Sequence, residues 1–156
     1  MNYESWAKDL PDEFKTDPLW RIEAYRLALF VADIAWHDTT KLSKDSRTQS
    51  PADQVYRATG SVAANISEGY SRKSGKDQAR FYEYSLGSAR EARGWYYQAR
   101  HILSTEVTIH RIKLLTRIIK LTNKMVPEKR GSRISEEKAE YSTSEIPYLL
   151  EHIPFP

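Results

Sequence analysis

The sequence predicts an all-α protein, an antiparallel up-and-down four-helix bundle, on three observations. Four segments repeat apolar residues at spacings of three and four, which is the period of one helix face. The connections between these segments are short, and no segment alternates apolar and polar residues as a half-buried strand does. The chain has 156 residues, which is enough for one domain with a real core.

The first two helices are marked by their ends. The first is predicted over residues 20–42, with Asp17 as its N-cap and Pro18 in the first turn, where a missing N–H costs nothing. A polar, aperiodic connection follows. The second helix is predicted over residues 50–69 and repeats the serine-then-proline start. Gly69 is its expected C-terminal stop.

The last two helices complete the bundle. The third is predicted over residues 76–103, and the fourth starts at a Thr105 cap and ends at Pro127. Gly87 and Gly94 lie inside the third helix, where each glycine costs about 1 kcal/mol relative to alanine, so we expect a close helix–helix approach there. The pattern predicts this inward face for the third helix: Phe81, Tyr84, Ser88, Ala92, Trp95, Ala99 and Ile102.

Three regions follow from these elements. Residues 1–17 form an acidic N-terminal extension, residues 18–127 the bundle, and residues 128–156 a polar, proline-punctuated C-terminal tail. Two apolar stretches of the tail, residues 146–150 and 153–155, dock onto the bundle or a neighbouring subunit, unless the whole tail frays.

Charge is distributed unevenly along the chain. The formal net charge is only +3, but residues 57–133 contain 16 basic and 6 acidic side chains, a net charge of +10. The rest of the chain carries −7. A basic middle between acidic ends indicates a polyanionic partner or a self-association surface.

Several classes of protein are excluded or disfavoured. The chain has no cysteine, which excludes disulfides, thiol chemistry and cysteine-bound metals. The longest apolar run, residues 27–36, is interrupted by Asp33 and is too short to span a bilayer. Residues 1–10 lack the pattern of a signal peptide. We therefore expect a cytoplasmic protein with no membrane partner.

Two motifs resemble signatures of a known family. Residues 57–72 read RATGSVAANISEGYSR and resemble the pattern Ser-[Ile/Val]-x-x-Asn-Ile-[Ala/Ser]-Glu-Gly-x-x-Arg, which closes the second helix of the family. Residues 81–91 read FYEYSLGSARE and resemble the second signature, an apolar segment that ends in Gly-Ser-x-x-Glu. Both occur in the family's order and spacing. The chain thus resembles the four-helix-bundle protein family, also called 23S rRNA-intervening-sequence proteins.

The resemblance carries expectations about function. Members of this family look like non-enzymatic helical proteins that assemble as rings, typically pentamers, and some are encoded within insertions in ribosomal RNA genes. A similar bundle occurs in the accessory variability determinant protein of diversity-generating retroelements, which engages a reverse transcriptase and nucleic acid.

The polar positions of the two motifs predict a hydrogen-bonded lock between the second and third helices. Within each motif the polar residues share a helix face, and an arginine or amide can donate to the carboxylates. The competing hypothesis is acid–base catalysis by paired carboxylates, Glu68 and Glu91, but neither a nucleophile nor a nearby histidine accompanies them. The predicted lock consists of Ser61, Asn65, Glu68, Arg72, Ser88 and Glu91.

Metal binding is not expected. A di-metal bundle site needs a Glu-x-x-His motif on two helices, and no histidine here follows a glutamate at that spacing. The histidines are His37, His101, His110 and His152. His37 and Asp38 are interpreted as a polar exit from the first helix. We expect no catalytic residue, no metal, no cofactor and no small-molecule substrate.

Basic residues near the second turn and on the fourth helix predict a nucleic-acid surface. Such residues on amphipathic helices also occur as an ordinary solvated face, which is the competing interpretation. Interleaved tyrosines, Tyr82, Tyr96 and Tyr97, would stack on bases. The predicted nucleic-acid contacts are Arg72, Lys73, Lys76, Arg80, Arg117, Lys120 and Lys124.

Consecutive aromatic residues predict a homo-oligomer. Trp95, Tyr96 and Tyr97 cannot all point into one core, so at least one faces outward, and aromatic residues are favoured at subunit interfaces. The competing interpretation is that they cover the edge of the bundle.

Together these patterns favour a non-enzymatic, ring-like homo-oligomer, with a pentamer as the family's typical form. It would act as a structural or RNA- or ribosome-associated protein, with RNA or DNA as the partner. The alternative is a protein-interaction adaptor that uses the acidic extensions and the C-terminal tail without nucleic acid.

Overall fold

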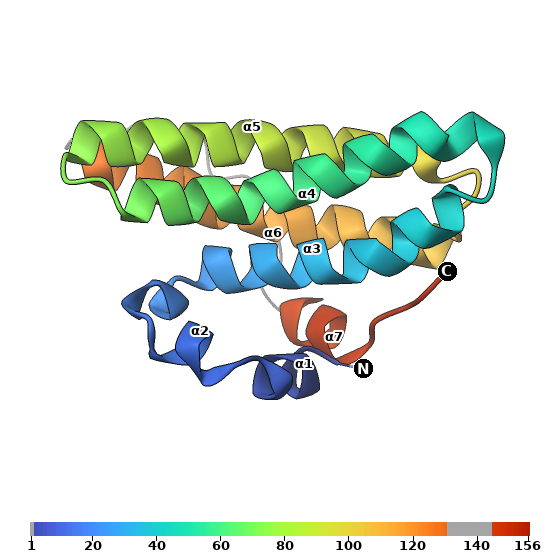
Figure 1. Ribbon diagram of the computed structural model, residues 1–156, viewed down its shortest axis with the longest axis horizontal. Helices are drawn as coiled ribbons and strands as arrows, with labels where there is room; N and C mark the ends of the chain where they lie inside the picture. The colour runs from blue at the N-terminus through green and yellow to red at the C-terminus, as the bar shows by residue number, and fades with distance from the viewer. Residues whose placement is uncertain (1, 131–144) are drawn as a thin grey trace.

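A computed structural model describes residues 2–130 and 145–156, and these residues form helices and no strand. Residues 131–144 of the predicted tail lie outside the described residues. Each of the four long helices packs against the next, and the last also contacts the first (Figure 1). This confirms the all-α bundle. The four helices are α3 (Glu23–Leu42), α4 (Gln49–Tyr70), α5 (Gly75–Ala99) and α6 (Thr105–Arg130).

The ends of α3 and α4 differ from the prediction. The side chain of Asp17 does accept a hydrogen bond, from the N–H of Leu19 at 2.8 Å, but it caps a short 3-10 helix, Pro18–Arg21. The α-helix itself begins at Glu23. Gly69 does not stop α4, because it lies inside the helix and is buried against α5.

The ends of α6 also correct the prediction. Thr105 is its first residue, and the cap is the preceding Ser104, whose hydroxyl accepts from the N–H of Val107 at 3.2 Å. Pro127 lies within the last turns and the helix runs on to Arg130. A proline removes one backbone donor, and Pro127 does so only three residues before the end of the helix.

The buried face of α5 differs in part from the predicted one, because Tyr82, Ser85, Ala89 and Tyr96 are buried in place of the residues that precede them. Ala92 and Ala99 are buried as expected, but Tyr84 is 51% exposed. The prediction weighted large aromatic residues over alanine, whereas a face of small residues lets α5 lie close to both neighbouring helices. Its buried residues are Ala79, Tyr82, Ser85, Leu86, Ala89, Ala92, Tyr96 and Ala99.

The N-terminal extension is folded onto the bundle. It contains α1 (Tyr3–Asp9) and α2 (Asp12–Thr16), which lie beside α3 on the side away from α5 (Figure 1). Trp6 is the buried residue of α1; its ring lies 5.0 Å from that of Phe30, and its Nε1 donates to Asp33 at 2.9 Å.

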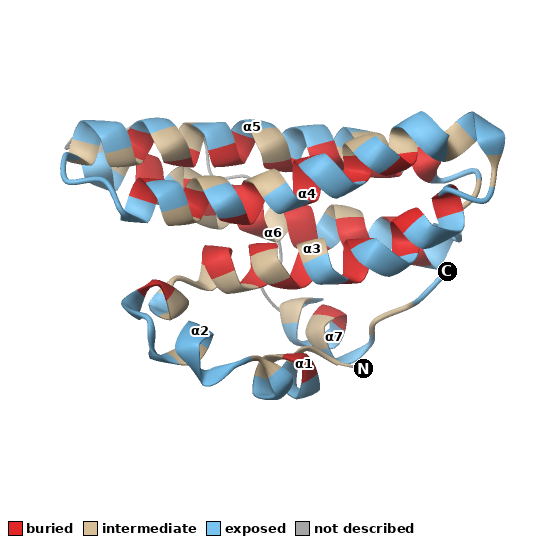
Figure 2. Cartoon of the chain, in the orientation of Figure 1, coloured by how far each residue is buried: buried red, intermediate tan, exposed pale blue. Residues whose placement is uncertain are grey.

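The described part of the tail also packs. Helix α7 (Ile146–Glu151) contacts α1 and α6 and buries Leu149 (Figure 2). The described chain ends therefore dock together along one side of the bundle. No described helix has the length and apolar character needed to cross a membrane.

Candidate nucleic-acid interface and buried polar centre

An ion pair lies in the middle of the bundle. Asp38 on α3 and Arg111 on α6 are both completely buried, and the guanidinium donates from Nε at 2.8 Å and from Nη2 at 3.1 Å to the two carboxylate oxygens. The hydroxyl of Tyr96 on α5 donates to the same carboxylate at 2.8 Å. Burial first, and then the nearby Asp38, raise the pKa of Tyr96 well above its usual value. Three helices thus share one satisfied polar centre.

This polar centre also holds the tail. Arg111 donates from Nη2 to the carbonyl oxygen of Pro154 at 2.9 Å, and its Nη1 lies 2.7 Å from Nδ1 of His110. Nε2 of His110 lies 2.7 Å from the carbonyl oxygen of Leu149. Because Arg111 can only donate and a carbonyl can only accept, His110 is the neutral tautomer with its proton on Nε2. Burial lowers the pKa of His110 to about 4.

These residues correct two sequence interpretations. Asp38 is not a polar exit from the first helix, and Arg111 is not one of the surface cations expected on the fourth helix, because both side chains are completely buried. Both fall on the apolar face of their helix, Asp38 four residues after the buried Ile34 and Arg111 four before the buried Leu115. A charge in register with a buried stripe is the sequence signal that could have identified them.

The predicted lock residues make their hydrogen bonds within single helices. The amide of Asn65 donates to the carbonyl of Ser61 at 2.8 Å, and Arg72 pairs with Glu68 on the same helix. On α5, Ser88 donates to Tyr84 O at 3.1 Å. Glu91, the remaining member, accepts from Trp95 Nε1 at 3.3 Å.

Other residues connect α4 to α5. The buried hydroxyl of Ser85 donates across to the carbonyl of Val62 at 2.9 Å. Gly69 faces Tyr82, and a Cβ added at Gly69 would lie 2.7 Å from a carbon of that ring. By contrast, a Cβ added at Gly87 or Gly94 would meet nothing within 4 Å, so the close approach expected at these two glycines is wrong. The glycine that permits close packing is Gly69.

Basic residues from two distant segments meet at one end of the bundle. A Cβ at Gly75 would collide with the main-chain oxygen of Lys129, so the start of α5 touches the end of α6. This contact places Lys73 and Lys76 at the same end as Lys124, and all three are exposed. No carboxylate among the residues that the structure describes forms an ion pair with any of the three. We call this surface the basic end, and it consists of Arg72, Lys73, Lys76, Arg80 and Lys124.

The other residues predicted to contact nucleic acid are less free to do so, because they are partly buried or already contact other side chains. Arg117 is half-buried and donates to Glu23 on α3 at 2.8 and 3.1 Å. Burial, and secondly Arg117, lower the pKa of Lys120. Within the basic end, Arg72 pairs with Glu68 and lies over the ring of Phe81 at 4.7 Å. Arg80 also lies over that ring, at 5.6 Å.

Burial separates the aromatic residues that were predicted to bind bases or a second subunit. Tyr96 is completely buried, so it belongs neither to an oligomer interface nor to a base-stacking surface, and Tyr82 is buried as well. Trp95 is half-buried, whereas Tyr97 is 57% exposed.

Sequence reasoning did not predict an exposed aromatic pair on α3 and α4. Trp36 on α3 is 60% exposed and its ring centroid lies 6.1 Å from that of Tyr56 on α4, in an edge-to-face arrangement. Both lie outside the apolar stripe of their helix, and this was the available signal.

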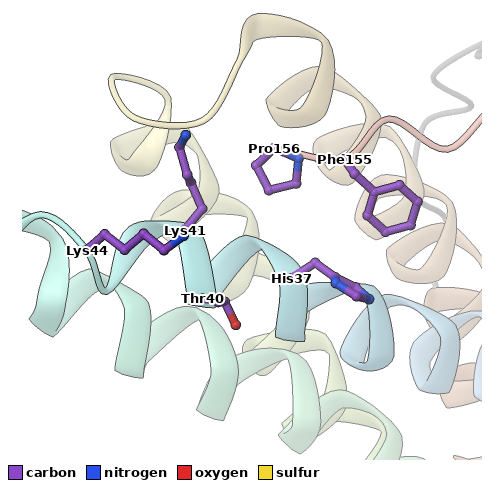
Figure 3. A pocket seen from close by; sticks show the side chains of 6 residues that line it. All are labelled: His37, Thr40, Lys41, Lys44, Phe155 and Pro156. Atoms are coloured by element: carbon purple, nitrogen blue, oxygen red, sulfur yellow. The ribbon is translucent and has the colours of Figure 1, made fainter.

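One surface hollow lies where the tail meets α3 (Figure 3). It has a volume of about 530 Å³ and an open mouth, and the ring of His37 lies 5.0 Å from that of Phe155. Its other lining residues are Thr40, Lys41, Lys44 and Pro156. It contains neither carboxylate of the catalytic hypothesis, and the described residues include no group of three His, Asp or Glu that could bind a metal.

These observations define the class: an all-α four-helix bundle with a buried polar centre and a basic end. Residues 21–126 match the family described as 23S rRNA-intervening sequence protein. Since the match spans more than half of the chain, the chain belongs to this family, as its two motifs indicated. Searches of curated proteins and of solved structures gave no match.

Proposed function

We propose that this chain is a non-enzymatic protein that binds the phosphate backbone of RNA or DNA through its basic end. The observation that carries the proposal is the meeting of Lys73 and Lys76 with Lys124, residues that lie about fifty positions apart in sequence, at one exposed end. Lysines without a carboxylate partner exchange counterions for phosphates at little cost, which drives sequence-independent binding. The family's name is consistent with an association with ribosomal RNA.

Titration of a labelled RNA over a range of salt concentrations tests this proposal. We expect log affinity to fall linearly with log salt, and the triple change Lys73→Glu, Lys76→Glu and Lys124→Glu to lower the slope by about 2 for a single strand. Arg57→Glu is the matched control, because Arg57 already pairs with Asp53 at 3.6 Å. A wild-type protein that retains no RNA or DNA at low salt would contradict the proposal.

We further propose that the protein forms a ring-like homo-oligomer, for which the pentamer is the first size to test. An exposed tryptophan beside an exposed tyrosine is unusual on a small monomer and is typical of subunit interfaces. Trp36 and Tyr56 supply such a pair, with Tyr97 as a second exposed aromatic. Native mass spectrometry of the wild type should show an assembly that Trp36→Ser with Tyr56→Ser dissociates, while Tyr148→Ser does not. A wild-type monomer would rule out this proposal.

A further inference from the structure

A shallow groove lies between α5 and α6, further along α5 than the basic end. It has a volume of about 440 Å³ and is lined by Arg90, Arg93, Gly94, Tyr97 and Ile112. A side chain at Gly94 would meet nothing within 4 Å, so the floor of the groove is open to an incoming molecule.

The arginines in and beside this groove have no acidic partner among the residues that the structure describes. Arg90, Arg93 and Arg100 form no ion pair with any carboxylate in the described parts of the chain. Arg93 donates to the hydroxyl of Thr116 at 3.3 Å. One acidic residue, Glu91, lies between Arg90 and Arg100, and it accepts from Trp95. A guanidinium without a carboxylate presents its fork of donors to a phosphate.

Two arginines of α6 do have acidic partners. Arg111 pairs with Asp38, and Arg117 pairs with Glu23. Lys113 pairs with Glu145, which precedes α7, at 3.1 Å. These three acidic partners come from α3 and from the residue that precedes α7. Figure 1 places α1, α2 and α7 beside α3, on the side away from α5. The acidic N-terminal extension and α7 therefore lie on the side of the bundle away from the arginines of α5.

An exposed aromatic ring completes the groove. Tyr97 is 57% exposed, and the guanidinium of Arg100 lies over its ring at 4.1 Å from the centroid. A tyrosine beside arginines is the arrangement that proteins use to stack an unpaired base while neutralising the adjacent phosphate. A duplex cannot use such a ring, because its bases are already stacked on one another.

We propose that this groove binds single-stranded nucleic acid, with an unpaired base on Tyr97 and phosphates on Arg90, Arg93 and Arg100. The inference rests on the proposed function and deepens it, because it assigns the strandedness of the partner. Lys76 and Tyr97 are separated by 21 residues of one helix, or about 30 Å, so the groove extends the basic end along α5. Gly87 lies between them, where no side chain obstructs a strand.

The test compares two probes on the full-length chain. Fluorescence anisotropy would measure the binding of a short unstructured uridine oligonucleotide and of an RNA duplex of equal length, at low salt. We expect Tyr97→Ala to weaken single-strand binding about tenfold and to leave duplex binding unchanged, because stacking is lost. Tyr97→Phe, which keeps the ring, should retain the affinity. Tyr84→Ala is the matched control, since Tyr84 is 51% exposed on the same helix but outside the groove.

The second part of the test reverses the charge of two groove arginines. Arg90→Glu with Arg93→Glu should lower both the single-strand affinity and the salt slope, whereas Arg57→Glu should lower neither. Circular dichroism and urea midpoints establish that each variant is folded. If the groove variants bind like wild type while the Lys73, Lys76 and Lys124 triple loses affinity, the groove proposal fails and the proposed function stands. If the wild type binds neither probe, both fail.

Self-association is the remaining competitor for this surface. Groove variants that change the native mass but not the affinity for the oligonucleotide would show that the groove is a subunit contact, and this result would overturn the proposal.

Discussion

Asp38 and Arg111 depend on one another because neither reaches water. Removing one partner of a buried pair leaves the other charge desolvated and unpaired, which typically costs about 3 to 5 kcal/mol. We therefore expect Asp38→Ala to lower the free energy of unfolding by that amount, measured by urea denaturation. Arg57→Ala, at an exposed pair, should cost less than about 1 kcal/mol. Equal effects of the two changes would show that the buried pair is not central to stability.

The same polar centre makes stability depend on pH through His110. The folded pKa of about 4 lies below the usual 6.5, so the unfolded chain binds the proton more readily, and stability falls as pH falls between these values. Lowering the pH from 7 to 5 should therefore cost about 2 kcal/mol. Urea denaturation at the two pH values measures this loss.

His110→Gln is the control for that measurement. Its amide can still donate to the carbonyl of Leu149, but it does not titrate, so the part of the pH dependence that comes from His110 should disappear. An unchanged dependence in this variant would assign the effect to other groups.

Little of this centre could be predicted from the sequence, for a physical reason. Periodicity identifies which residues share a face of one helix, but Asp38 and Arg111 are 73 positions apart and their pairing depends on how α3 meets α6. Each residue taken alone also fits a solvated position. Only the position of each charge on an apolar stripe pointed to burial.

At the scale of elements, replacing a helical glycine with alanine can raise or lower stability, depending on what surrounds the added methyl group. An added methyl at Gly69 would lie 2.7 and 2.9 Å from carbons of Tyr82, so we expect Gly69→Ala to destabilise the protein by about 1 to 3 kcal/mol through overpacking of α4 against α5. Gly87→Ala meets open space on an exposed helix face and should stabilise it by about 0.5 to 1 kcal/mol. Thermal or urea unfolding of the two variants measures both signs. If Gly69→Ala stabilised the protein, the ring of Tyr82 would have to move aside at little energetic cost.

The helices themselves were predictable, but their contacts were less so. Four apolar stripes and short connections determine a bundle, and all four helices occur where expected within a few residues. The inward face of α5 was not predictable by weighting hydrophobicity, because packing demands small residues such as Ala89 and Ala92 at the close approach and leaves Tyr84 outside. Volume, as well as polarity, decides which face of a helix is buried.

At the scale of the whole molecule, the described chain ends form one unit on the bundle. Helices α1 and α7 contact each other, and each contributes one buried side chain to the core, Trp6 and Leu149. Neither helix is long enough to be stable alone in water, since isolated helices of fewer than about 12 residues are marginal. Each therefore depends on the surface that the other provides.

This mutual dependence predicts energetic coupling between the two ends of the chain. Trp6→Ala should cost about 3 to 5 kcal/mol and Leu149→Ala about 2 kcal/mol or more, because both side chains are buried. When α1 detaches, α7 loses part of its contact surface, so the second change should cost less in the presence of the first. A double-mutant cycle by urea denaturation should show an interaction energy of at least about 0.5 kcal/mol.

The control for this cycle combines Trp6→Ala with Val62→Ala. Figure 1 places α4 on the far side of α3 from α1, so the two costs in free energy of unfolding should add. Additive costs for Trp6 and Leu149 would instead mean that each end docks independently on the bundle.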